Sequence, residues 1–460
     1  MKTGLLTITL CALVATAAAD TLVLDVERTV ELALANNHAI HQARARVEEA
    51  VAGRSASFGA MLPQLSASAS YTRLGTVSDF QMVAPVYGRF PLRVYDPQGN
   101  LIGFTDSIAM VIGIDTMELA LGGANNYILR GTAQQTLFTW GKLINAWRLA
   151  GLGAEIEEQG LRLARQQVRS RAVESFYGAM LAREMAELMR ESHRQLERHV
   201  GQVRSLHENG LATGLDLRRA RIGLSNLASE LARTESGAEL VLASLRNACG
   251  IEPDRPLALE GDVGYEAEPT ALDDAVAVAL TERPELEQLR RAARMADLGV
   301  RIARTANLPT LFAQFNYDYK NPVGFSPGWG SDWNVTAGAS VPLFTGGANH
   351  NRLSQALARE RQARIALAMT EEALALEVRA LYSKLEQERR NIELQSENTD
   401  LAREALALAE TAYENGIITN TEYLDTQLAL TRSRVSYLGS LANHRIARAA
   451  LRRAMGIEEN

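Results

Sequence analysis

Residues 413–419, with the sequence Tyr-Glu-Asn-Gly-Ile-Ile-Thr, interrupt a very long helical pattern, and residues 207–213, His-Glu-Asn-Gly-Leu-Ala-Thr, do the same 206 positions earlier. In each stretch the Asn-Gly pair supplies a residue that tolerates positive φ, which lets the first helix end. The Thr that closes each stretch is a good N-cap for the next helix. The sequence therefore predicts two helical hairpins with matching turns, at 208–214 and 414–420.

The two halves of the chain also align outside these turns. Residues 275–286 match 29–40 at an offset of 246 positions, whereas 343–345 match 137–139 at an offset of 206. The difference of forty residues places an insertion in the first half alone, at 74–124. Long insertions occur at exposed loop tips, so we expect an inserted extracellular loop, and its prolines and glycines predict mostly irregular structure.

Both halves, 20–250 and 271–460, contain the same order of elements and are joined by a linker at 251–270. Alternation of apolar and polar residues predicts strands at about 64–73, 126–138, 310–320 and 332–344. Three-four apolar spacing predicts helices at about 142–207, 215–249, 348–413 and 421–456, and another from 24 through 51. At 1.5 Å per residue, each of the two longest helices would measure about 100 Å.

Composition narrows the class of protein. Residues 1–19 have the charged start, apolar core and Ala-rich end of a secretory signal peptide. The net charge of −6, with no basic stripe, argues against nucleic acid as a partner. Cys249 is the single cysteine after that segment, so no internal disulfide is expected. Nucleotide-binding and nucleophile motifs are absent, and the histidines lack metal-ligand spacing, so we expect no enzyme, cofactor or metal site.

The predicted strands require assembly with further copies of the chain. No apolar stretch is long enough for a transmembrane helix, so the chain would enter a membrane as strands. Four strands with one apolar face match the length that crosses a bilayer, but they cannot close a barrel, and open edges are not tolerated in lipid. Three copies would supply twelve strands, an even number that suits a closed antiparallel barrel.

Several motifs together resemble the TolC-type outer membrane efflux family. They are the Leu-Asp-Val-Glu-Arg-Thr opening at 24–29, the Leu-Phe-Thr-Gly-Gly exit at 343–347, the two Asn-Gly-x-x-Thr turns and the Ala-x-Gly-Ile-Glu helix endings at 248–252 and 454–458. The resemblance covers essentially the whole chain after the signal segment. It implies a mostly α-helical protein with a transmembrane β part. In that arrangement a homotrimer forms a twelve-stranded outer membrane β-barrel continuous with a long periplasmic α-helical barrel.

The resemblance also implies a function and partners. The protein would be the outer membrane channel of a tripartite efflux or type I secretion system, a passive gated duct for small molecules or proteins. Its partners would be a periplasmic adaptor protein and an inner-membrane pump or ABC exporter. The alternative is a soluble periplasmic coiled-coil scaffold, for which the four alternating strand segments would have no use.

Site residues follow from the family's closable end, which is its ring of helical turns. By position, Asp216, Glu422 and Asp425 would form rings of like charge at the constriction, and Tyr413 would make closure contacts. A structural interpretation remains open, in which Asp216 and Glu422 only stabilise a first helical turn and Tyr413 only packs. The turn residues expected to dock the adaptor are Asn209, Gly210, Thr213, Asn415, Gly416, Ile418 and Thr419.

One departure from the family pattern concerns closure. Some members have an arginine two positions after the turn glycine, where this chain has Ala212 in the first half and Ile418 in the second. A salt bridge between protomers from that position is therefore not available. We expect closure to depend more on apolar contacts.

Overall fold

The computed structural model describes residues 21–76, 79–120, 123–324 and 328–457. The predicted signal peptide, 1–19, lies outside the described residues. The chain divides into two compact units. The first, which contains most of the helices, comprises Met1–Arg54, Leu149–Leu298 and Ala356–Asn460, and the second, which contains the long strands, comprises Ser55–Arg148 and Gly299–Gln355.

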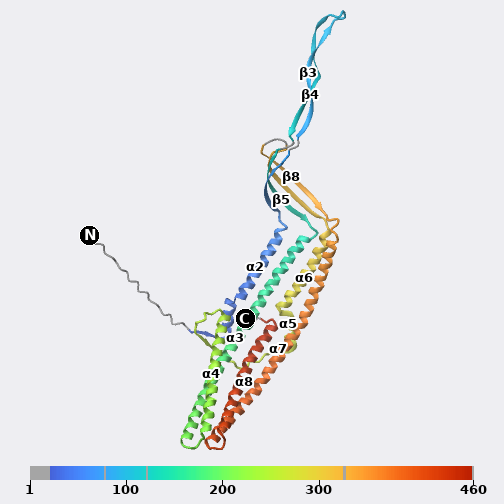
Figure 1. Ribbon diagram of the computed structural model, residues 1–460. Helices are drawn as coiled ribbons and strands as arrows, with labels where there is room; N and C mark the ends of the chain where they lie inside the picture. Colours follow the sequence, from blue (N-terminus) through green and yellow to red (C-terminus); the bar gives the residue numbers. More distant parts are fainter. Residues whose placement is uncertain (1–20, 77–78, 121–122, 325–327, 458–460) are drawn as a thin grey trace, which may run out of the picture. The chain divides into compact units, whose positions relative to one another are not determined.

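The order of elements repeats between the halves (Figure 1). The first half contains β1 (Leu22–Leu24), α1 (Val26–Asn36), α2 (His38–Gly59), β2 (Gln64–Arg73), β3 (Asp79–Tyr95), β4 (Leu101–Ala120), β5 (Asn125–Phe138), α3 (Lys142–Glu208) and α4 (Gly214–Cys249). The second contains β6 (Leu257–Leu259), α5 (Leu272–Glu282), α6 (Pro284–Arg304), η1 (Thr305–Asn307), β7 (Thr310–Asn321), β8 (Gly330–Ser340), α7 (Ala348–Glu414) and α8 (Asn420–Ala454).

Four strands form one antiparallel sheet in the order β2-β5-β7-β8. Its polar face is internally bonded. Arg130 Nε and Nη2 donate to the two carboxylate oxygens of Asp318 at 2.7 and 2.8 Å, and Thr132 and Asn334 hydrogen-bond to Asn316. Asp318 and Asn316 retain only 7% and 9% exposure. On β7 the polar side chains of Asn316 and Asp318 are therefore covered, whereas the apolar side chains that alternate with them are exposed.

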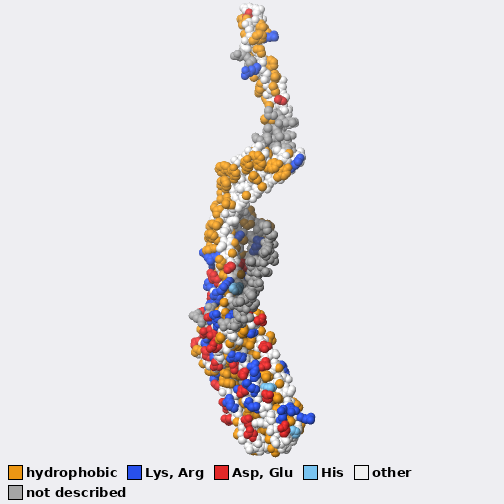
Figure 2. All heavy atoms as spheres, turned by 90° about the vertical axis from the view of Figure 1, so that its left-hand side faces the viewer, with side chains coloured by type: hydrophobic (Ala, Val, Ile, Leu, Met, Phe, Trp, Pro, Cys, Tyr) orange, Lys and Arg blue, Asp and Glu red, His pale blue; other side chains and the backbone are white. Residues whose placement is uncertain are grey.

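The opposite face of the sheet is apolar and open. Its exposed side chains are Leu65, Tyr71, Tyr127, Leu129, Leu311, Phe315, Tyr317, Tyr319, Trp333 and Val335. Figure 2 shows hydrophobic side chains gathered over the strands, whereas acidic and basic side chains are mixed over the helices. An exposed, continuous apolar face opposite a hydrogen-bonded polar one is inverted relative to a water-soluble protein and is typical of strands that face lipid.

Aromatic rings gather at both ends of this sheet. At one end Trp329 contacts Tyr127 and Tyr319, with centroids 5.9 and 5.0 Å apart. At the other, Trp140 packs edge-on against Phe138 and donates from Nε1 to the carbonyl oxygen of Pro309 at 2.8 Å. Two aromatic belts separated by a strand length are typical of the two interfaces of a bilayer.

The inserted segment differs from the expected irregular loop. Residues 79–95 and 101–120 form an antiparallel hairpin, β3–β4, with register shifts after Val86, Pro91 and Val94. The prolines misled the prediction, because proline is tolerated in an edge strand where its missing N–H would face outward. The charged residues of this segment are compatible with a two-stranded ribbon that has no buried face.

Three other boundaries also differ from expectation. The last long strand ends at Ser340 rather than 344, because Pro342 cannot donate to the ladder. The 251–270 linker contains β6, which pairs in parallel with β1. The predicted helix at 24–51 is two helices, because the chain is extended at Asn37. The same break recurs at Arg283, before Pro284, as the duplication requires.

In the helical unit, short helices pack on long ones in both halves. Val30 and Ala33 of α1 pack with Val168 and Ala172 of α3. In the second half, Ala275 and Ala279 of α5 pack with Val378 and Leu385 of α7 and with the end of α8. A third core joins β1 and α3 to α4, and its buried side chains are Leu24, Phe176, Met180, Leu245 and Cys249 among others.

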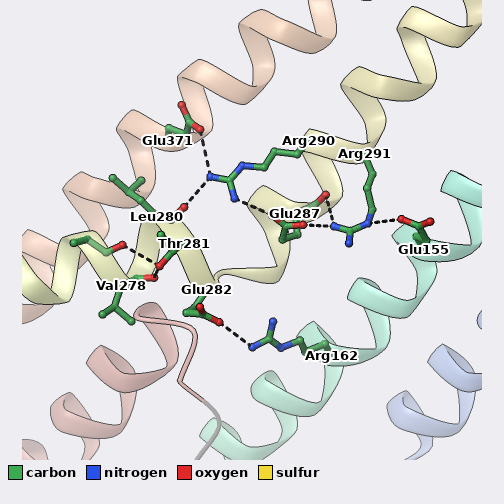
Figure 3. A network of polar contacts seen from close by, with 11 residues as sticks. Glu155, Arg162, Val278, Leu280, Thr281, Glu282, Glu287, Arg290, Arg291 and Glu371 are labelled. Atoms are coloured by element: carbon green, nitrogen blue, oxygen red, sulfur yellow. Dashed lines mark hydrogen bonds and ion pairs between the residues drawn. The ribbon is translucent and has the colours of Figure 1, made fainter.

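Ion pairs tie α6 to both neighbouring long helices (Figure 3). Arg291 bonds Glu155 of α3 at 3.0 Å and also pairs with Glu287. Arg290 lies 3.8 Å from Glu371 of α7 and donates to the Leu280 carbonyl oxygen at 2.9 Å. These partly exposed networks fix the register of the helices more than they add to stability.

Among the described residues, no helix combines the length and the apolar character that a membrane crossing would need.

Candidate functional site: the paired helical turns

The first turn joins α3 to α4. Gly210 has φ of 77°, and the N–H of Leu211 donates to the Leu206 carbonyl oxygen at 2.8 Å. Asn209 Nδ2 donates back to the Ser205 carbonyl oxygen at 2.8 Å. This is the Schellman-type ending that the Asn-Gly pair predicted, and it satisfies the last carbonyls of α3.

The second turn joins α7 to α8 with the same hydrogen bonds. Gly416 has φ of 71°, the N–H of Ile417 donates to the Ala412 carbonyl oxygen at 2.8 Å, and Asn415 Nδ2 donates to the Thr411 carbonyl oxygen at 2.8 Å. The two turns lie side by side at the same end of the helical unit (Figure 1). The backbone prediction is confirmed in both halves.

Asp216 and Glu422 close capping boxes. The N–H of Asp216 donates to Thr213 Oγ1 at 3.1 Å, and the N–H of Thr213 donates to the Asp216 carboxylate at 3.2 Å. Thr419 and Glu422 repeat this arrangement at 3.3 and 2.7 Å. The backbone and side-chain hydrogen bonds from Thr419 lower the pKa of Glu422. Both carboxylates thus have the structural role that the sequence left open as an alternative.

Asp425 lies one helical turn beyond Glu422 and is exposed. Within the described part of the chain it takes part in no ion pair or side-chain hydrogen bond. Its counterpart in the first turn is Arg219, which donates to Thr421 of the other hairpin at 3.2 Å. Of the three predicted carboxylates, Asp425 is therefore the one that makes no such bond among the described residues.

Tyr413 packs against an aromatic cluster that the sequence did not predict. His199 of α3 is 1% exposed and contacts two rings, with Tyr423 stacked at 4.0 Å and 22° and Tyr413 tilted at 5.0 Å, and the two tyrosine rings lie 5.7 Å apart. Its Nε2 lies 2.7 Å from Asn420 Oδ1, and no hydrogen bond to its Nδ1 is found among the described residues. Burial lowers the pKa of His199, so the neutral imidazole is favoured.

Asn420 links the two hairpins. It is buried, and while its Oδ1 faces His199 its Nδ2 donates to the Asp216 carbonyl oxygen at 3.1 Å. A single amide thereby joins the start of α8 to α3 and to the start of α4. The one sequence signal for this contact was the position of Asn420, an amide that follows directly after the predicted cap Thr419 in the first helical turn.

Six of the seven predicted docking residues are exposed and Ile418 is half-buried, and two large apolar side chains that were not predicted are exposed beside them. Leu211 and Ile417, directly after the turn glycines, are 77% and 75% exposed. Ala212 and Ile418, which the resemblance indicated, are half-buried. Ala212 packs with Val200, Val203 and Leu217 in a small core. Each turn therefore presents one large apolar side chain to solvent.

Comparison with known proteins decides the family. The sequence profile of the outer membrane efflux proteins matches residues 29–251 and 275–457, which is most of the chain and both of its halves. The chain belongs to the outer membrane efflux protein family. It is accordingly an outer membrane channel of the kind used in efflux or type I secretion, a transport protein rather than an enzyme, and it extends from the outer membrane into the periplasm.

Individual relatives are distant but cover most of this efflux-family channel. It is 25% identical over 440 residues to the outer membrane protein OprJ of Pseudomonas aeruginosa, covering 94% of this chain and 84% of that protein. It is 25% identical over 323 residues to the alkaline protease secretion protein AprF of the same species, covering 66% and 64%.

Solved structures agree with the fold. A crystal structure of CusC superimposes with a TM-score of 0.75 at 18% identity, covering 94% of this chain and 92% of that one. The CmeC outer membrane channel of Campylobacter jejuni gives 0.75 at 17% identity, covering 94% and 85%. The predicted fold class is confirmed, and family membership excludes the soluble scaffold considered as the alternative.

Proposed function

We propose that three copies of this channel assemble into a passive duct whose barrel contains twelve strands and whose periplasmic end is closed by the six helical turns. The observation that carries the proposal is the inverted sheet. Its apolar face is exposed between aromatic belts, its polar face is hydrogen-bonded, and the outer edges of β2 and β8 pair with no strand among the described residues. Pairing β2 with β8 of the next copy satisfies both edges and leaves a polar bore.

Assembly and location are tested together by fractionation. The expected result is recovery in the outer membrane as a trimer that dissociates on heating. Substituting a proline for Val335, in the edge strand β8, removes one N–H and is expected to weaken the trimer. Recovery of the wild-type protein as a soluble monomer would contradict the proposal.

The six turns are proposed as the gate. In the trimer, Asp425 would form a ring of three carboxylates that favours cations. Asp216 and Glu422 would contribute mainly by holding the turns in place through their caps, and Tyr413 by packing with His199. Closure would then depend on packing within and between hairpins, in agreement with the absence of an arginine at Ile418.

The adaptor is proposed to dock on the exposed apolar residues of the turns. Leu211 and Ile417 stand at equivalent positions, so a trimer would present six similar apolar contacts to a periplasmic adaptor that serves a pump or an ABC exporter. Cysteines at Leu211 and Ile417 are expected to cross-link to the adaptor in assembled complexes. Cysteines at half-buried Ala212 and Ile418 are the matched controls and should react less. Equal or absent adducts at both pairs would contradict this surface.

A further inference from the structure

The β3–β4 hairpin is a separate two-stranded sheet. Its strands have 17 and 20 residues, and among the described residues they pair with no strand of the four-stranded sheet. At about 3.3 Å per residue the paired strands span roughly 50 Å. Its turn is ordered, because Asp96 accepts hydrogen bonds from the N–H groups of Gln98 and Asn100 at 3.0 and 2.7 Å. The insertion is therefore a regular β-hairpin with a defined turn.

Both faces of the hairpin are apolar and exposed. The strand register and the packing of Phe90 and Ile112 over Gly88 assign the side chains to faces. One face presents Met82, Val86, Phe90, Ile108, Met110 and Ile112. The other presents Val83, Tyr87, Val111 and Ile114. An isolated two-stranded ribbon is marginal in water, and apolar patches of this extent indicate a binding surface.

A second copy of the chain fits this two-sided surface better than a lipid surface does. A membrane surface would cover one face and leave the other in water. Around a threefold axis, by contrast, each hairpin has a neighbour on each side. The hairpin is also continuous with the proposed protomer interface, because β3 begins at Asp79, shortly after the edge strand β2 ends at Arg73.

The neighbours are expected to contact through side chains rather than through a shared strand ladder. β3 contains Pro85 and Pro91, which lack N–H groups. Prolines in an edge strand oppose pairing with another strand. The apolar faces remain as the surfaces available for contact.

We propose that the β3–β4 hairpins of three copies pack face to face into a collar around the axis of the channel. This proposal rests on the proposed trimer. The collar buries the apolar faces between protomers and adds a contact to the assembly that lies outside the barrel strands and the helices.

Cross-linking tests the collar in the full-length trimer. Val86→Cys and Tyr87→Cys place thiols on opposite faces of the hairpin. The double variant, treated with a short bismaleimide in outer membranes, should give covalent dimers and trimers on denaturing gels, whereas each single variant should give far fewer. Cys249 does not interfere, since it is fully buried and burial raises its pKa to about 11.

The outcomes separate the proposals. An intact trimer in native gels without cross-links would overturn the collar and leave the trimer standing. Thiols that do not cross-link and react with a water-soluble maleimide only after the lipid is removed would identify lipid as the occupant and also overturn it. A monomer in native gels would overturn both the collar and the trimer.

Deleting the hairpin gives an independent measurement. Replacing residues 79–120 by a short Gly-Ser linker should preserve a heat-dissociable trimer, because the four-stranded sheet is unchanged. The temperature at which this trimer dissociates should fall by several degrees. An unchanged dissociation temperature would contradict the collar.

Discussion

The two helical turns have the same backbone and different surroundings. Both end a helix with Asn-Gly and begin the next with a Thr capping box. At equivalent positions, however, the first turn has Gly214, Leu217 and Arg219 where the second has Asn420, Tyr423 and Asp425. The second turn is packed onto α3 through the imidazole of His199, whereas Ala212 and Leu217 of the first pack on Val200 and Val203 of that helix.

This difference distinguishes the residues that form the backbone of both turns from the residues through which the turns would function. The shared residues form the backbone of a helical hairpin, which any copy of the duplicated unit requires. The residues that differ couple one hairpin to the other and place Asp425, a carboxylate with no ion pair among the described residues, one helical turn after the cap. We therefore propose that, of the two turns, the second contains the selective part of the gate.

The largest expected effect comes from removing Tyr423. Tyr423→Ala deletes a buried ring that is stacked on His199, which costs about 3–5 kcal/mol of local stability. The equivalent Leu217→Ala removes a half-buried side chain and should cost about 1–2 kcal/mol. Amide hydrogen exchange at the start of α8 and α4 measures both losses. Equal losses would remove the distinction between the turns.

Substitutions at Asn420 and at the equivalent Gly214 should have the next largest effect. Asn420→Gly leaves the Asp216 carbonyl oxygen and His199 without their buried partner and should cost about 1–3 kcal/mol. Gly214→Ala, at an exposed helix start, should be neutral or stabilising by about 0.5–1 kcal/mol. Limited proteolysis at the turns reports the difference. If Gly214→Ala were destabilising and Asn420→Gly neutral, the predicted difference between the two turns would be contradicted.

Acid should loosen the second turn more than the first. Burial lowers the pKa of His199 in the folded state, so the unfolded state binds a proton more readily. This contribution to stability is complete above the unfolded pKa of about 6.5 and is lost as the pH falls below it, by at most about 1.4 kcal/mol per pH unit. Glu410, whose charge favours the protonated imidazole, moderates the loss.

Hydrogen exchange at the start of α8 between pH 7.5 and 5.5 tests this dependence. His199→Gln should abolish it. The lowered pKa of Glu422 acts in the same direction at lower pH, where that carboxylate loses its capping bonds, so the chosen range isolates His199. His444, whose pKa burial also lowers, lies away from the turns, and a local measurement excludes it. A pH dependence that persists in His199→Gln would refute the assignment.

The smallest expected effect, which should be the same in both turns, comes from removing the N-caps of α4 and α8. Thr213→Ala and Thr419→Ala each remove a capping box and should each cost about 1 kcal/mol. Because the two backbones are alike, the two losses should agree within a few tenths of a kcal/mol. Exchange rates in the first turns of α4 and α8 provide the measurement, and clearly unequal losses would show that the scaffold itself differs.

Local sequence patterns were sufficient to predict the fold. They were not sufficient for the site, because part of it is formed by contacts between positions that lie far apart in the sequence. Periodicity located the four sheet strands and both long helices, because their side-chain spacing follows from one secondary structure at a time. The glycines and threonines of the turns likewise act within a few residues. His199 and Asn420, in contrast, meet across 221 positions, and no local spacing encodes that contact.

The β3–β4 hairpin shows a different limit. Proline is excluded from a strand that pairs on both edges, so the prolines of this segment predicted irregular structure. In a two-stranded ribbon each strand pairs on one edge only, and proline is tolerated there. The role of Glu422 and Asp216 was ambiguous for a related reason. A carboxylate three residues after a Thr can cap a helix or line a pore, and the hydrogen bonds at 2.7 and 3.2 Å establish the cap within one chain.

Single-channel conductance tests the central inference that the second turn contains the selective gate. In planar bilayers we expect the wild-type channel to prefer cations and to be blocked by divalent cations, and Asp425→Asn should lose most of both properties. Glu422→Ala with Asp425→Ala should lose no less, and Asp216→Asn, its control in the first turn, should retain the preference. Unchanged selectivity in Asp425→Asn, or an equal loss in Asp216→Asn, would contradict the account.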